Sequence, residues 1–168
     1  MDILIKLVKF IQRYPNDAEL GRAIREWYNN KFNNMITLIL MMIAGILNAI
    51  MDRIAFTFKS SVFKNLNPHF WNVKESWKNQ WKWPLRPYTK KYYLGLYTPR
   101  YEEKFPFSST FLIWATDAWH LAKSLMLGFI TLGIVLYCPM FNFIIDMFLY
   151  YCAFTITFTY FYEYILKK

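Results

Sequence analysis

The sequence predicts an all-helical integral membrane protein with about three transmembrane helices, and three observations carry this prediction. Hydrophobic residues make up 56% of the chain and aromatic residues 21%. Residues 108–168 are almost unbroken apolar sequence. The net charge of +9 is concentrated in segments that flank the apolar runs. Because about 20 apolar residues in a helix cross a bilayer, this apolar content is more than a soluble domain of this size needs.

Residues 1–34 predict two amphipathic helices that do not cross the bilayer. In residues 3–14 the apolar side chains fall near one helix face, and Pro15 ends the helix. Asn16 and Glu19 then form a capping-box pattern that begins the second helix. Both helices are expected to lie along the membrane surface or to pack on a partner.

Residues 35–58 predict the first transmembrane helix, with Asp52 and Arg53 near its far end. Residues 59–107 are polar, aromatic and interrupted by prolines, and they are too long for a simple loop. An interfacial aromatic and basic subdomain with one helix near 73–82 is therefore expected. Tryptophans among lysines also occur in single-strand nucleic-acid binders, but the flanking spans favour a role as membrane anchors. These anchors are Trp71, Trp77, Trp81 and Trp83.

Residues 108–168 predict a hairpin of two transmembrane helices that turns at Cys138 and Pro139. Ser108 or Ser109 is expected to cap the second transmembrane helix, and Pro139 suits the first turn of the third. Three spans place 59–107 and the C-terminus on one side, with twelve of the twenty Lys and Arg residues. The positive-inside rule predicts that this side is cytoplasmic.

Six ionisable residues are expected to gather near the cytoplasmic boundary, and they form the main candidate site. They are Asp52, Arg53, Asp117, His120, Lys123 and Glu163. Asp117 and His120 are three residues apart, so they are neighbours on a helix surface. One interpretation is structural: pairs such as Asp117 with Arg53 neutralise each other. The other is functional, with Arg53 and Lys123 on a lipid phosphate, a metal on Asp117, His120 and Glu163, or a proton relay.

Asp146 lies alone in the third predicted transmembrane helix, about 10 Å below the turn by helical rise. A single buried aspartate suits a proton or cation site. It equally suits a structural role in which the protonated side chain bonds Thr131 or Asn142.

The sequence contains no Gly-rich phosphate loop, G-x-S-x-G, H-E-x-x-H or C-x-x-C motif. We therefore expect a non-enzymatic interaction or accessory module of a membrane assembly, with no cofactor. Its expected partners are the bilayer, anionic lipid headgroups, and a protein partner or second copy, while nucleic acid is not expected. The alternatives are a membrane-embedded enzyme or lipid-headgroup-binding protein using Asp117 and His120, and an ion- or proton-conducting pore.

Four stretches resemble an uncharacterised group of small bacterial and phage membrane proteins. They are SVFKNLNPHFWN at 61–72, ESWKN at 75–79, FPFSST at 105–110 and TDAWH at 116–120. The resemblance covers 61–120 and implies no activity, cofactor or catalytic residue. It implies a protein of the bacterial inner membrane.

Overall fold

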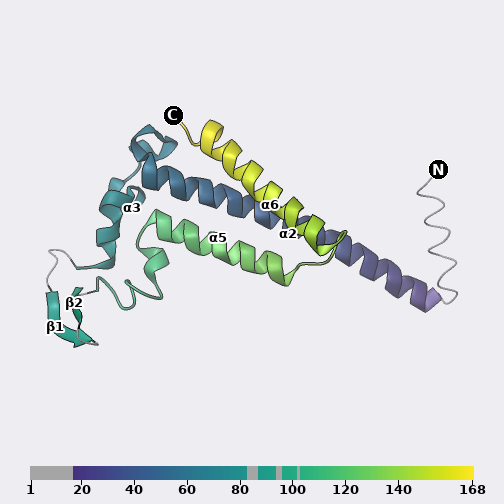
Figure 1. Ribbon diagram of the computed structural model, residues 1–168, viewed down its shortest axis with the longest axis horizontal. Helices are drawn as coiled ribbons and strands as arrows, with labels where there is room; N and C mark the ends of the chain where they lie inside the picture. The colour runs from purple at the N-terminus through teal and green to yellow at the C-terminus, as the bar shows by residue number, and fades with distance from the viewer. Residues whose placement is uncertain (1–16, 83–86, 94–95, 102) are drawn as a thin grey trace.

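Three long helices form the body of the protein in the computed structural model (Figure 1). The residues described are 17–82, 87–93, 96–101 and 103–168. The long helices are α2 (Asp17–Phe56), α5 (Ala118–Val135) and α6 (Phe143–Tyr160), which continues as the π-helix η5 (Phe161–Ile165). They run in alternating directions, so the described residues between 57 and 117 and the C-terminus lie at one end, the loop end (Figure 1). Residues 136–142 connect α5 to α6 at the opposite end, the turn end.

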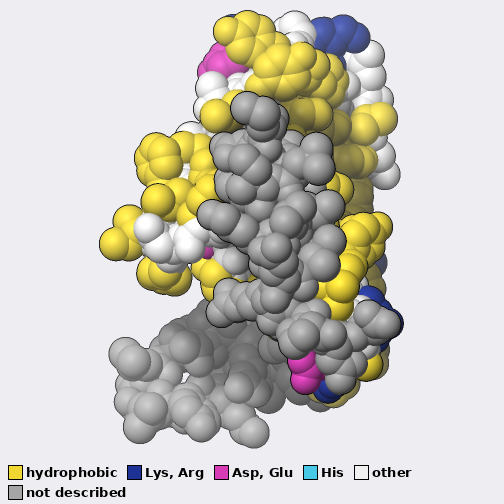
Figure 2. Space-filling view, turned by 90° about the vertical axis from the view of Figure 1, so that its right-hand side faces the viewer, with side chains coloured by type: hydrophobic (Ala, Val, Ile, Leu, Met, Phe, Trp, Pro, Cys, Tyr) yellow, Lys and Arg dark blue, Asp and Glu magenta, His cyan; other side chains and the backbone are white. Residues whose placement is uncertain are grey.

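All three helices are long and apolar enough to cross a membrane, which confirms the prediction of three apolar helices of spanning length within the described residues. These candidate spans are Ala18–Phe56, Ala118–Val135 and Phe143–Ile165. Large apolar side chains are exposed along α5 and α6, as at Ile134 and Phe148. Figure 2, which views the molecule from the turn end, shows apolar side chains over most of the described surface on that face, with few charges among them. A surface of this composition suits contact with lipid.

α2 is one continuous helix, which corrects the prediction of an amphipathic helix up to residue 34 followed by a separate span over 35–58. Its 40 residues extend for about 60 Å at 1.5 Å each, roughly twice the thickness of a bilayer core. Between Asp17 and Phe56 there is no proline to stop it. Its N-terminal part extends past the turn end (Figure 1). The first predicted amphipathic helix lies outside the described residues.

α2 is the central helix, because α5 and α6 both pack on it and make little contact with each other. Small residues allow this close packing. A Cβ atom at Gly45 would lie 2.4 Å from the carbonyl oxygen of Phe154 in α6, and one at Gly133 of α5 would lie 2.8 Å from Met41 Cε. Ala44 is fully buried. The predicted hairpin therefore straddles α2 instead of closing on itself.

Both hairpin helices begin later than the sequence predicts. α5 begins at Ala118 rather than near Ser108, because Asp117 is extended and its side chain accepts the N–H of His120. Residues before it form turns and the 3₁₀-helix η4 (Ile113–Ala115). α6 begins at Phe143 rather than after Pro139, because the Asn142 side chain accepts the N–H of Ile145. A side-chain acceptor at the N-cap stabilises a helix start, and these two residues decide where each helix begins.

The loop end is a subdomain of short turns and one β-hairpin. The helical turns are η1 (Phe58–Ser60), η2 (Val62–Asn65), α3 (Pro68–Trp71), α4 (Val73–Ser76) and η3 (Trp77–Gln80). The helix predicted near 73–82 is thus replaced by α4 and η3. Strands β1 (Pro87–Tyr93) and β2 (Leu96–Tyr101) pair antiparallel, an element the sequence analysis missed. The C-terminal segment holds the subdomain to α6, since Val62 N–H donates to the carbonyl of Leu166 at 3.1 Å.

Candidate functional sites

Asp117 and His120 form a close pair at the start of α5. One Asp117 oxygen lies 2.7 Å from His120 Nδ1 and also accepts the Thr116 hydroxyl at 3.1 Å. The other accepts the backbone N–H of His120 at 2.9 Å. The carboxylate is buried, while the imidazole is about one-quarter exposed. Asp117 and His120 are therefore close together, as predicted. Asp117 is also the N-cap residue of α5, and its side chain stabilises the first turn of this helix.

The pair could orient an imidazole for proton transfer, because a carboxylate at Nδ1 favours the tautomer with a basic Nε2. Lys123 does not join it: its ammonium lies over the Trp119 ring, 4.8 Å from the ring centroid. Glu163 bonds Lys167 at 3.8 Å instead. No group of three His, Cys, Asp or Glu side chains able to hold a metal occurs in the part of the chain that the structure describes. The predicted metal set of Asp117, His120 and Glu163 is therefore not assembled.

Arg53 contacts the π-helix η5 rather than Asp117. Its Nε donates to the carbonyl of Tyr162 at 2.8 Å, and Nη2 donates to the same oxygen. Its guanidinium carbon also lies 3.9 Å from the centroid of the Tyr162 ring, and Nη1 donates to Thr57 at 3.1 Å. Arg53 is 4% exposed, so it joins the ends of α2 and α6 as a buried bridge. The half-buried Asp52 has no hydrogen-bond or ionic partner among the described residues.

The predicted six-residue cluster is therefore divided among separate contacts. The ends of α2 and α6 and the start of α5 do lie together at the loop end, as the order of the spans requires (Figure 1). There, however, Arg53 bonds a backbone carbonyl, Asp117 caps a helix and Lys123 stacks on an indole ring. These contacts support the structural interpretation of the cluster over a single reactive centre.

The predicted tryptophan anchors differ in their surroundings. Trp71 stacks on Phe63 with ring centroids 4.9 Å apart, inside the subdomain. Trp77 is exposed, and Trp81 pairs through an isolated backbone bridge with Glu103. Trp83 lies outside the described residues. The sequence analysis missed other exposed aromatic residues before α5. It placed Phe111 and Trp114 inside the predicted helix and Phe107 directly before it.

A cavity of about 570 Å³ lies within the loop-end subdomain. It is lined by His69, Glu75, Lys78, Asn79, Trp81, Lys82 and Lys104. Among the described residues, its wall holds three lysines and one carboxylate, and we call it the basic cavity. Its residues come from segments 69–82 and 104, so no contiguous motif marked it in the sequence.

Asp146 is buried at the turn end, where it holds the α5–α6 connection. Its carboxylate accepts the Tyr137 hydroxyl at 3.0 Å and the N–H groups of Met140 and Phe141 at 2.9 and 3.1 Å. Its side chain therefore bonds neither Thr131 nor Asn142, the two predicted partners, because α6 begins at Phe143 and Asp146 falls in its first turn. Desolvation and the hydrogen bond to Asp146 raise the pKa of the Tyr137 hydroxyl above its ordinary value.

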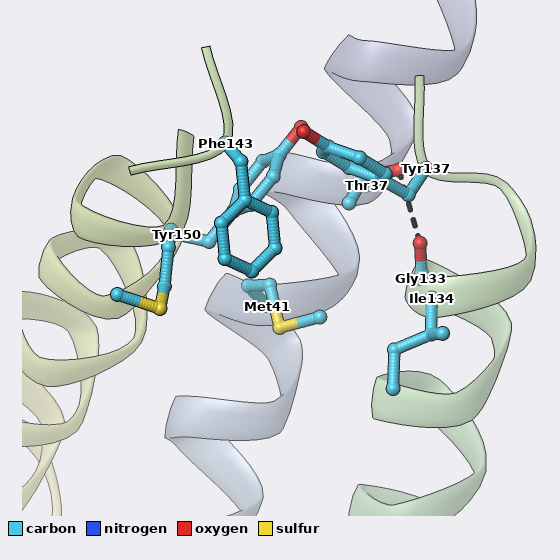
Figure 3. A pocket seen from close by; sticks show the side chains of 8 residues that line it. Thr37, Met41, Gly133, Ile134, Tyr137, Phe143 and Tyr150 are labelled. Carbon is cyan, nitrogen blue, oxygen red and sulfur yellow. Dashed lines mark hydrogen bonds between the residues drawn. The ribbon is translucent and has the colours of Figure 1, made fainter. Parts of the chain in front are cut away.

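A second cavity, of about 250 Å³, lies beside this turn between all three long helices (Figure 3). We call it the apolar cavity, since carbon atoms form most of its wall. Its lining residues are Thr37, Met41, Gly133, Ile134, Tyr137, Phe143, Met147 and Tyr150. The buried Tyr150 hydroxyl and the Asn34 side-chain oxygen have no hydrogen-bond partner within the described residues. Since a cavity of about 150 Å³ holds benzene, this one can admit a larger apolar group.

Comparisons with protein-family models, with curated proteins and with solved structures found no match. The resemblance to bacterial and phage membrane proteins therefore stays a prediction.

Proposed function

We propose that this protein is a non-enzymatic membrane module that associates with another protein through α2. The observation that carries the proposal is the length of α2, which extends past the turn end of the bundle (Figure 1). Large apolar side chains on this extension are exposed, namely Ile24, Trp27, Tyr28, Phe32 and Met35. Exposed apolar surface outside a bilayer span is typical of a contact surface.

The extension is amphipathic. Ile24, Tyr28 and Phe32 are four residues apart, so they lie on one face of the helix, whereas Glu26 lies on another. Exposed Ile39, further along α2, continues this face into the apolar part of the helix. A partner helix that crosses the bilayer and also extends beyond it can pack along the whole face. α2 of a second copy is such a helix, and a homodimer is therefore the simplest assembly.

The polar contacts of the bundle support a structural rather than a catalytic role. Asp117 caps a helix, Arg53 joins two helix ends, and Asp146 closes a turn. Each of these three groups bonds other groups of this chain, and each of these bonds has a structural role. These contacts favour an interaction module over a membrane enzyme that uses Asp117 and His120, and over a pore through Asp146.

We further infer that the loop end faces the cytoplasm of a bacterial cell, where its lysines contact anionic headgroups. The support is the excess of Lys and Arg in 59–107 and at the C-terminus. A cysteine in place of exposed Lys64 should react with an impermeant maleimide only after the inner membrane is opened. Labelling of Lys64→Cys in intact spheroplasts, at the rate seen in opened ones, would reverse this orientation.

Disulfide cross-linking in native membranes tests the association. In a background with Cys138→Ser and Cys152→Ser, Tyr28→Cys should form a covalent dimer on mild oxidation. Glu26→Cys is the matched control, because Glu26 is also exposed and lies on another face of α2. A higher-mass adduct of Tyr28→Cys with another protein would replace the homodimer by a hetero-oligomer. Equal cross-linking of Tyr28→Cys and Glu26→Cys would contradict the proposal. The proposal would also be contradicted if neither variant cross-linked and both kept the mass of the monomer.

A further inference from the structure

The apolar cavity exists because α5 and α6 both pack on α2 and make little contact with each other. Near the turn end, α2 closes the space between the other two helices (Figure 3). Its buried part is formed by Thr37 of α2 and Gly133 of α5, where the Thr37 hydroxyl donates to the Gly133 carbonyl at 3.5 Å. The shape of the cavity is therefore fixed by the packing of three helices.

The rim of the apolar cavity faces the surroundings of the bundle. Ile134, Phe143 and Met147 line the cavity, and each of these side chains is more than half exposed. They belong to the candidate membrane spans of α5 and α6, so lipid chains would surround this rim in a bilayer. An occupant therefore enters from the bilayer, and most of its surface must be apolar to match the wall.

One end of the cavity is polar. The rings of Tyr137 and Tyr150 meet edge to face with centroids 6.1 Å apart, and their hydroxyl groups lie at the same end of the cavity (Figure 3). The Tyr137 hydroxyl donates to Asp146 at 3.0 Å, whereas the buried Tyr150 hydroxyl has no hydrogen-bond partner among the described residues. A buried hydroxyl without a partner is destabilising. An occupant with an apolar body and one polar group would fill the space and supply the missing partner.

A neutral hydroxyl group suits this polar end best. It can accept the Tyr150 O–H and donate to the Tyr137 oxygen, whose own proton is donated to Asp146. A carboxylate cannot donate, and it would meet the negative charge of Asp146, which lies one helical turn before Tyr150 on α6. The charge at this end therefore disfavours a fatty-acid anion.

We propose that the apolar cavity binds a neutral, largely apolar molecule from the bilayer that carries one hydroxyl group. Its hydroxyl bonds Tyr150 and Tyr137, and its hydrocarbon part lies between the three helices. Benzene in a cavity of about 150 Å³ corresponds to about 25 Å³ for each carbon, so about 250 Å³ accommodates about ten carbon atoms. This site lies within one chain and does not depend on the association through α2.

Photolabelling of the full-length protein in phosphatidylcholine nanodiscs tests the site. The probe is an octanol that carries a photoreactive diazirine, and mass spectrometry locates the labelled residues. Labelling should saturate, concentrate on residues that line the cavity, and be displaced by decanol. Decane and ionised decanoate have the same chain length, and each should displace the probe about fivefold less well, because neither makes the two hydrogen bonds of a hydroxyl.

Two variants with matched controls test the residues. Tyr150→Phe should weaken displacement by decanol about fivefold, because one hydrogen bond is lost, and Tyr151→Phe on the exposed side of α6 should not. Met147→Trp should abolish saturable labelling, because the larger ring fills the cavity. Phe148→Trp is its control, since Phe148 is exposed and lies outside the cavity. Circular dichroism confirms that each variant is folded.

Labelling that rises in proportion to the probe and spreads along the exposed faces of α5 and α6 would show simple partition into lipid and would overturn the proposal. Equal displacement by decanol and decane, or unchanged displacement in Tyr150→Phe, would overturn the assignment of a hydroxyl ligand. The Tyr28→Cys cross-link is measured separately in every variant, so failure of one proposal leaves the other intact.

Discussion

The two ends of the bundle use a buried ionic group in opposite ways. At the turn end, Asp146 bonds groups that lie five, six and nine residues away in the chain. At the loop end, Arg53 bonds Tyr162, which is 109 residues away. The aspartate fixes a local turn, whereas the arginine fixes how two distant helices meet. We therefore expect the hairpin turn to form from its own sequence, and the loop end to form only once α2 and α6 have packed.

Contacts of the C-terminus are a second example of long-range pairing at the loop end. Lys168 N–H donates to the carbonyl of Ser60 at 2.9 Å, beside the bond from Val62 to Leu166. The segment after η5 is thereby paired with the segment after α2. Loss of the α2–α6 contact should release the subdomain as well as the helix ends.

The largest effect is expected where α2 and α6 approach most closely. Gly45→Ala places a Cβ atom 2.4 Å from a backbone oxygen of α6, so the helices must move apart. The expected loss of stability is about 3 kcal/mol, at the upper end for overpacking. Gly128→Ala is the control: its Cβ would meet nothing within 4 Å, and the change should be neutral or stabilising. Unfolding by dodecyl sulfate in mixed micelles measures both, and equal behaviour would contradict α2 as the central helix.

Removal of the Asp146 carboxylate should be next in size. Asp146→Ala leaves the Tyr137 hydroxyl and two backbone N–H groups without their acceptor. We expect a loss of about 2–3 kcal/mol, since unsatisfied buried donors cost about 1–3 kcal/mol. Hydrogen exchange should quicken at Met140 and Phe141 while the loop end keeps its protection. Faster exchange at both ends would show that the turn is not a local unit.

Arg53→Gln should lower the global stability less than Asp146→Ala does, but it should loosen more of the structure. The shorter amide cannot keep the paired bonds and ring contact at Tyr162, and the expected loss is about 2 kcal/mol. Limited proteolysis should then cut both η5 and residues 58–66, with the α5–α6 turn unaffected. Protection of the C-terminal segment in this variant would show that the backbone pairing alone holds the loop end.

The smallest effect is expected in the apolar cavity. Tyr150→Phe removes a buried hydroxyl that has no partner among the described residues, so stability should stay the same or rise by less than about 1 kcal/mol. Tyr151→Phe on the exposed side of α6 is the control and should change nothing. A clear loss of stability in Tyr150→Phe, with none in Tyr151→Phe, would show that the Tyr150 hydroxyl forms a hydrogen bond when the protein is in the membrane.

Three apolar helices of spanning length were predictable because apolar length is a local property of the sequence. The proximity of Asp117 and His120 was predictable for the same reason, since residues three apart meet within one turn. The starting residues of the helices were not predictable, because several residues in each segment can act as an N-cap. Asp117 rather than Ser108 caps α5, and Asn142 rather than the residue before Pro139 caps α6. The continuity of α2 was missed, since a capping pattern and a change of composition do not by themselves end a helix.

By itself, then, the sequence determined how many helices could cross a bilayer and which end carries the basic subdomain, because hydrophobicity and charge act residue by residue. Only the tertiary structure decided that Arg53 bonds Tyr162 rather than Asp117, and that lysines from separate segments line one cavity. These outcomes depend on how α2 rotates and slides against α5 and α6. Close contacts at Gly45 and Gly133, which bring together residues about 90 to 110 positions apart, set that packing.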